Sequence, residues 1–140
     1  MNSIFIDTGA FYGLEVARDQ CHLKCAHGWH RLRDEPLMLF SSHHVLHETI
    51  ELLARRVGPK AAAERLETYA AGGQIVWLED GPADWLQAAE LMRKFADQKI
   101  SFIDCLSFAL MNRERIENVF GFDRHFEQAG FALWPADHTV

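Results

Sequence analysis

The chain has 140 residues, of which 49% are hydrophobic and 24% charged, and its formal net charge is −6 at pH 7. This composition is typical of a folded globule and excludes a disordered chain, and the length predicts one domain over residues 1–140. The negative charge argues against strong non-specific binding to nucleic acid, although bound metal ions can reverse the sign of a local surface.

Targeting and cysteine signals point to the cytoplasm. No apolar run reaches the roughly 18 residues that a membrane-spanning helix needs, and Met1-Asn2-Ser3 does not begin a signal peptide. The cysteines, Cys21, Cys25 and Cys105, are odd in number and do not form a disulfide framework. We therefore expect a cytoplasmic protein with reduced thiols and no membrane contact.

Short apolar strands alternate with helices along the chain. The expected strands cover residues 4–6, 37–40, 75–78, 119–120 and 132–134. The expected helices cover residues 20–34, the segment between the caps Ser41-Ser42 and Gly58, residues 60–71, the segment from Pro82, and residues 101–113 and 124–128. Continuously apolar strands separated by helices indicate an α/β fold, with a parallel sheet of about five strands covered on both faces.

Four acidic residues lie where the chain changes direction, each beside an apolar segment: Asp7, Glu48, Asp104 and Asp123. Asp7 and Asp123 follow strands, while Glu48 and Asp104 lie in the first turns of helices. Ligands of such sheets bind outside the carboxyl ends of the strands, so all four acids can share one edge. Gathered carboxylates repel one another, and a hard divalent cation such as Mg²⁺ or Mn²⁺ relieves that repulsion.

Each acid also has a structural interpretation when it is taken singly. Ser101-x-x-Asp104 matches a capping box, Asp123 can cap the short helix after it, and Asp7 can be a turn residue. Glu48 is early enough in its helix to interact favourably with the helix dipole. The chain lacks a Walker-type loop, a G-x-G-x-x-G motif and a G-x-S-x-G elbow, so carboxylate-bound metal favours phosphodiester hydrolysis over nucleotide-driven chemistry.

Four segments, in order and spacing, resemble the PIN-domain nucleases and, among them, the VapC-like toxins of bacterial toxin–antitoxin pairs. They are residues 6–9 (IDTG), 41–49 (SSHHVLHET), 101–109 (SFIDCLSFA) and 119–126 (VFGFDRHF). The resemblance implies a three-layer α/β/α sandwich and a Mg²⁺- or Mn²⁺-dependent endoribonuclease that acts on RNA. It also implies a small antitoxin protein as partner and a homodimer. The chain departs from the pattern at Gly121, where related chains often carry a Thr or Ser hydroxyl.

The resemblance assigns a role to several residues. Asp7, Glu48, Asp104 and Asp123 would be the catalytic, metal-binding acids. Thr8 and Ser101 would supply hydroxyls that contact those acids or a phosphate.

The histidines near the acidic edge have two interpretations. His43, His44 and His125 are candidates for contacting RNA, and His44 and Glu48 are spaced to form a hydrogen bond with each other. Solvated or internally bonded histidines are the alternative. The dense cysteine and histidine segment at residues 21–30 predicts inward-packing helix residues rather than zinc, because structural zinc sites bring separate ligand pairs together.

Two competing functions belong to other classes. A catalytically silent RNA-binding or regulatory module on the same fold would bind RNA without metal and would not cleave it. A small-molecule phosphatase of the aspartyl-phosphate type usually needs an acid two residues after its nucleophile, and that position here is Gly9.

Overall fold

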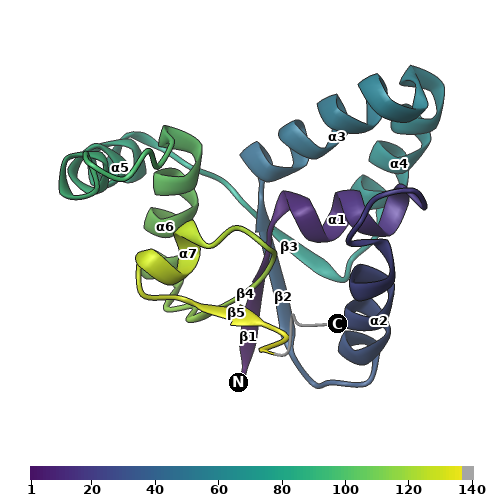
Figure 1. The fold of residues 1–140 in the computed structure, drawn as a ribbon, viewed down its shortest axis with the longest axis horizontal. Helices are drawn as coiled ribbons and strands as arrows, with labels where there is room; N and C mark the ends of the chain where they lie inside the picture. The colour runs from purple at the N-terminus through teal and green to yellow at the C-terminus, as the bar shows by residue number, and fades with distance from the viewer. Residues whose placement is uncertain (137–140) are drawn as a thin grey trace.

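One parallel sheet organises the structure, a computed structural model that describes residues 1–136 (Figure 1). Its five strands are β1 (Ser3–Ile6), β2 (Met38–Ser42), β3 (Ile75–Leu78), β4 (Asn118–Phe120) and β5 (Ala132–Trp134). They lie in the order β3-β2-β1-β4-β5, and every neighbouring pair is parallel. The predicted parallel sheet is confirmed.

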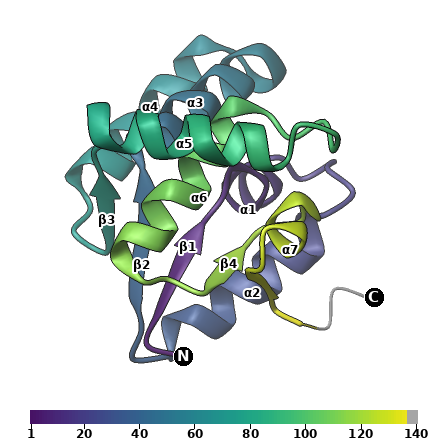
Figure 2. The ribbon, with the colours of Figure 1, turned by 90° about the vertical axis from the view of Figure 1, so that its left-hand side faces the viewer.

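Helices cover both faces of this sheet (Figures 1 and 2). On one side lie α1 (Thr8–Glu15), α2 (His22–Arg33), α3 (His43–Val57) and α4 (Pro59–Ala71). On the other lie α5 (Pro82–Lys94), α6 (Phe102–Glu114) and α7 (His125–Gln128). This arrangement is the three-layer α/β/α sandwich that the resemblance implied. Within residues 1–136, no helix is long and apolar enough to cross a lipid bilayer.

The sheet register brings the carboxyl ends of the inner strands to one edge. Ile6 at the end of β1 pairs with Phe120 at the end of β4, and Ser42 at the end of β2 pairs with Leu78. In Figure 1 this edge is the upper end of the sheet, where α1, α3 and α6 begin. Any polar residue that directly follows β1, β2 or β4 is therefore placed at the same edge.

Two elements differ from the sequence prediction. The helix α1 was not expected, because its sequence Thr-Gly-Ala-Phe-Tyr-Gly-Leu-Glu contains two glycines, which disfavour a helix. Its buried residues Ala10 and Phe11 show that packing on the core stabilises it instead. Strand β2 runs to Ser42 rather than ending at residue 40, because Ser41 and Ser42 pair with β3.

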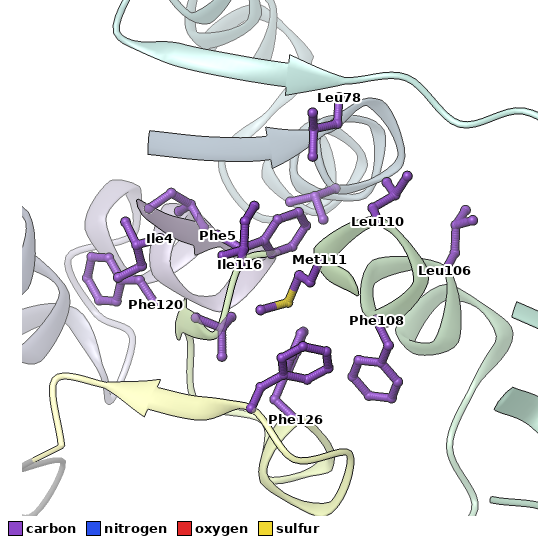
Figure 3. Packing of buried hydrophobic residues seen from close by; sticks show 14 of the residues in the cluster. Ile4, Phe5, Leu78, Leu106, Phe108, Leu110, Met111, Ile116, Phe120 and Phe126 are labelled. Atoms are coloured by element: carbon purple, nitrogen blue, oxygen red, sulfur yellow. The ribbon is translucent and has the colours of Figure 1, made fainter. Parts of the chain in front are cut away.

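One part of the core lies between the sheet and α6 (Figure 3), and another includes Ala10, Phe11 and Leu32 of the opposite helical layer. Ile4, Phe5 and Ile6 of β1 are fully buried, and α6 buries every residue from Cys105 to Met111. The aromatic ring of Phe108 on α6 lies 5.1 Å from that of Phe126 on α7, measured between ring centroids. The buried part of α6 begins one residue after Asp104, so packing of this helix on the core fixes the position of Asp104 at its more exposed start.

Candidate active site

Asp7 occupies the junction between β1 and β4. It is the N-cap of α1, and its backbone N–H donates to the carbonyl oxygen of Phe120 at 3.0 Å, which extends the β1–β4 pairing by one residue. A Cβ atom at Gly121 would lie only 3.0 Å from the Cβ of Asp7. The glycine thus makes room for Asp7, and a hydroxyl residue there would require one of the two to shift.

The carboxyl group of Asp7 is the electrostatic centre of the site. Burial is the main reason that its pKa is raised from the usual 3.8 to about 7. The negative charges of Asp104, Glu48 and Asp123 contribute to this rise, and a hydrogen bond from the Thr8 backbone opposes it. A carboxyl group whose pKa responds to the charges of three other acids lies near them. The structure therefore brings the four acids together at one edge, where the sequence placed them.

Thr8 connects two of the helices that begin at this edge. Its Oγ1 donates a hydrogen bond of 2.5 Å to Oε1 of Glu48, which joins the first residue of α1 to the second turn of α3. Thr8 is buried, whereas Glu48 is exposed. Thr8 thus holds a carboxylate that solvent or substrate can reach, a role that fits the expected hydroxyl beside the acids.

Ser101 and Asp104 begin α6 as the sequence predicted. Ser101 is the N-cap, and its Oγ accepts a hydrogen bond of 3.1 Å from the backbone N–H of Asp104. The carboxylate of Asp104 contacts His125, because its Oδ2 lies 3.0 Å from Nδ1 of the His125 ring. The cap therefore orients Asp104, and its carboxylate faces the site.

Asp123 and His125 form a compact turn between β4 and α7. Asp123 Oδ1 accepts a hydrogen bond of 2.9 Å from the His125 backbone N–H and lies 3.3 Å from the ring Nδ1 of His125. Among residues 1–136, Asp104, Asp123 and His125 form a group whose ligand atoms all lie within 4.8 Å of one another. The sequence placed His125 beside the acids but did not show that its ring would join Asp104 to Asp123.

His44 is engaged by serines rather than by Glu48. Its Nδ1 lies 2.9 Å from Oγ of Ser42, and its Nε2 lies 2.8 Å from Oγ of Ser107 on α6. Burial lowers the pKa of His44 to about 4, so the ring is neutral near pH 7. The predicted His44–Glu48 hydrogen bond is therefore replaced by a link between the first turn of α3 and the second turn of α6. His43 begins α3 and is half-buried.

The segment at residues 21–30 is used for packing. Cys25 is buried, and its Sγ lies 3.5 Å from the Gly9 carbonyl oxygen, while Nδ1 of His22 lies 2.8 Å from the Gly13 carbonyl oxygen. A Cβ atom on Gly13 would overlap with the Cys25 sulfur, so α1 and α2 approach closely here. Cysteine and histidine side chains that bond to carbonyl oxygens support the packing interpretation of this segment.

Comparison with known proteins identifies the family. A family model described as PIN domain matches residues 4–132. This chain belongs to the PIN domain family. This chain is 37% identical over 133 residues to the 23S rRNA-specific endonuclease VapC20 of Mycobacterium tuberculosis. The alignment covers 91% of this chain and 95% of the relative.

Solved structures agree with this relationship. VapC20 of Mycobacterium tuberculosis, described as a toxin that cleaves the sarcin–ricin loop, superimposes with a TM-score of 0.84 and 31% identity, covering 92% of this chain and 96% of VapC20. FitAcB from Neisseria gonorrhoeae, at 17% identity, has a TM-score of 0.67, with 97% of this chain and 99% of that chain covered. PAE2754 from Pyrobaculum aerophilum, at 21% identity, has a TM-score of 0.59, with 94% and 89% covered. These two show the fold alone.

The relationship confirms the predicted fold and the predicted class of protein, an endoribonuclease toxin. PIN nucleases use divalent metal ions, and the grouped Asp104, Asp123 and His125 form an acidic cluster of the kind that can hold one. The donor set fits such an ion, because Asp7 and its neighbours place excess negative charge where a cation would lower the repulsion.

Proposed function

We propose that this PIN domain, as one domain over the whole chain, is a cytoplasmic endoribonuclease that depends on Mg²⁺ or Mn²⁺. Asp7, Glu48, Asp104 and Asp123 would hold the metal. The observation that carries the proposal is the meeting of acids from distant segments at one sheet edge. The ligand atoms of Asp104, Asp123 and His125 lie within 4.8 Å of one another, and the charges of Asp104, Glu48 and Asp123 act on the carboxyl group of Asp7. A site that gathers like charges at a cost in stability is typical of function rather than of folding.

The side chains of the site would have different roles in hydrolysis. The bound ion supplies activation of water and stabilisation of the leaving oxygen. Thr8 orients the Glu48 carboxylate through its hydrogen bond, and the Ser101 cap orients Asp104. Because Glu48 is exposed and Asp104 and Asp123 are half-buried, a phosphodiester backbone can reach these groups from solvent. His43 and His125 lie at the same edge as candidate contacts for RNA.

We infer the substrate class from the names of the relatives, and the partner from the resemblance to VapC-like toxins. Since VapC20 is named a 23S rRNA-specific endonuclease and a toxin that cleaves the sarcin–ricin loop, a structured rRNA hairpin is the substrate class we propose here. A cognate antitoxin would inhibit the enzyme, and the active form would be a homodimer. The net charge of −6 means that recognition relies on local contacts near the metal rather than on a broadly basic surface.

The test is cleavage of a sarcin–ricin hairpin by the purified chain in Mg²⁺ or Mn²⁺, with EDTA as the metal-free control. Asp7→Asn should lower the cleavage rate by about 100-fold or more, because it removes one metal ligand worth several kcal/mol in the transition state. Glu90→Gln, a change at an exposed acid on α5, should cleave like the unsubstituted protein.

Other outcomes would redirect the proposal. RNA that binds equally well with EDTA and stays intact in every lane would favour the silent RNA-binding module. If the hairpin, a hairpin with a scrambled loop and a tRNA are cleaved equally, the proposed nuclease activity stands. The proposed specificity for an rRNA hairpin is then wrong.

A further inference from the structure

One residue outside the acidic set, His125, lies beside two of the acids. Nδ1 of His125 lies 3.0 Å from Oδ2 of Asp104 and 3.3 Å from Oδ1 of Asp123. All three side chains keep contact with solvent, with 30%, 19% and 39% of their surface exposed for His125, Asp104 and Asp123. An ion from solution can therefore reach a position that faces one nitrogen and two oxygen atoms.

The position of His125 is held by the protein on both sides. Its backbone N–H donates to Asp123, and the next residue, Phe126, is fully buried against Phe108 of α6. Asp104 is fixed by the Ser101 cap at the start of the same helix α6. The ring of His125 thus sits beside the two acids because core packing places it there, which is how a protein preorganises a ligand.

The observed separations suit ligands of one ion. Two neighbouring ligands of an octahedral ion at about 2.1 Å lie roughly 3.0 Å apart. The distances of 3.0 and 3.3 Å from Nδ1 to the two carboxylates match this separation, and they match a hydrogen bond equally well. The two states differ only in the tautomer: a neutral imidazole with its proton on Nε2 presents the Nδ1 lone pair to a cation.

We propose that His125 is a nitrogen ligand of the metal site and that the site therefore prefers Mn²⁺ to Mg²⁺. The inference rests on the proposed function and deepens it by choosing the ion. Mg²⁺ takes oxygen ligands and gives up its water reluctantly, whereas first-row transition ions accept imidazole. His44, the other half-buried histidine that bonds across elements at this edge, uses both ring nitrogens on Ser42 and Ser107.

The experiment compares metal binding and the electronic environment of the bound ion. Titration calorimetry with Mn²⁺ alone and Mg²⁺ alone would be run on the full chain, on His125→Gln and on the control His47→Gln. Pulsed electron paramagnetic resonance of the Mn²⁺-loaded proteins would detect nitrogen coupled to the ion. Thr8 and the four acids are unchanged in all three proteins, so the carboxylate ligands are constant.

The inference predicts specific results. The unsubstituted chain should bind Mn²⁺ about 10-fold or more tighter than Mg²⁺ and show nitrogen coupling. His125→Gln should lose about 10-fold in Mn²⁺ affinity, keep its Mg²⁺ affinity within about 3-fold, and lose the nitrogen signal. His47→Gln, a change at an exposed residue of α3, should retain both.

The experiments distinguish failure of the His125 inference from failure of the proposed function. If the unsubstituted chain binds Mn²⁺ and cleaves RNA but shows no nitrogen coupling, or if His125→Gln keeps that coupling, His125 is not a ligand although the proposed function stands. If the chain binds neither ion and leaves RNA intact, the proposed function itself fails. If His125→Gln does not fold, the unsubstituted chain is prepared with isotopically labelled histidine, and the spectrum is searched for coupling between histidine nitrogen and Mn²⁺. Absence of this coupling overturns the inference.

Discussion

Asp7 destabilises the metal-free fold when it is ionised, and the same residue is a proposed metal ligand. Burial of its carboxyl group, together with the nearby charges of Asp104, Glu48 and Asp123, raises its pKa from 3.8 to about 7. The ionised form is therefore unfavourable in the folded, metal-free protein. A divalent cation would reverse this cost, because it favours the ionised form of every acid around it.

Asp7→Asn should stabilise the metal-free protein at high pH. Since the folded pKa is about 7 and the ordinary value is 3.8, ionisation destabilises the fold progressively as the pH rises between these two values. In EDTA at pH 8, Asp7→Asn should be more stable by the order of 1–3 kcal/mol, and at pH 3.5 the two proteins should unfold alike.

Thermal unfolding at both pH values measures this difference. The control is Asp97→Asn, at an exposed position beyond α5, which should change little at either pH. A variant at position 7 that is less stable at pH 8 than the unsubstituted protein would contradict the account.

Among the secondary-structure elements, α3 and α6 matter most, because they carry Glu48 and Asp104. His44 joins these helices through Ser42 and Ser107, and it lies one turn before Glu48 on α3. Ser107 lies one turn after Asp104 on α6. The hydrogen-bonded link therefore sets the separation of the two helix starts, and with it the separation of two carboxylates.

Removing the link should weaken metal binding without unfolding the protein. His44→Ala or Ser107→Ala should reduce Mn²⁺ affinity by about 10-fold, the scale of a lost supporting hydrogen bond at a metal site. The double variant should lose little more than either single one, because each change breaks the same contact. Titration calorimetry of the three variants measures this, and His47→Ala is the matched control on α3.

Fully additive losses would show that the two residues act independently. A loss of stability with unchanged Mn²⁺ affinity would assign His44 to packing alone.

At the scale of the whole molecule, the site is formed by residues from segments that are far apart in the sequence. Asp7 follows β1, Glu48 lies on α3, Asp104 begins α6, and Asp123 follows β4. Only the folded chain brings these groups together, so an ion bound there stabilises the native state over the unfolded one.

Metal should therefore raise the melting temperature of the entire domain. Mn²⁺ at about 100 times its dissociation constant should add about 2.7 kcal/mol, as expected for a ligand that binds only the folded state. Differential scanning calorimetry with Mn²⁺ and with EDTA measures the shift. Asp104→Asn should show a much smaller shift, and an equal shift in both proteins would mean that the ion binds elsewhere.

Local patterns in the sequence determined most of the fold and the positions of the acids. Apolar runs such as residues 4–6 predict strands because a short buried strand needs continuous hydrophobic side chains. Ser42 and Ser101 predict helix starts because their hydroxyl groups accept backbone N–H groups a few residues away. These rules act within a few residues, so the chain order of strands, caps and acids can be read without the structure.

The tertiary structure alone decided which side chains meet. The helix α1 forms because the core accepts Phe11, although its own residues disfavour a helix. His44 bonds to Ser107, 63 residues away, instead of to Glu48 one turn along. The ring of His125 reaches Asp104, 21 residues away, because Phe126 is buried. Contacts of this kind depend on packing between distant segments, which local sequence patterns do not encode.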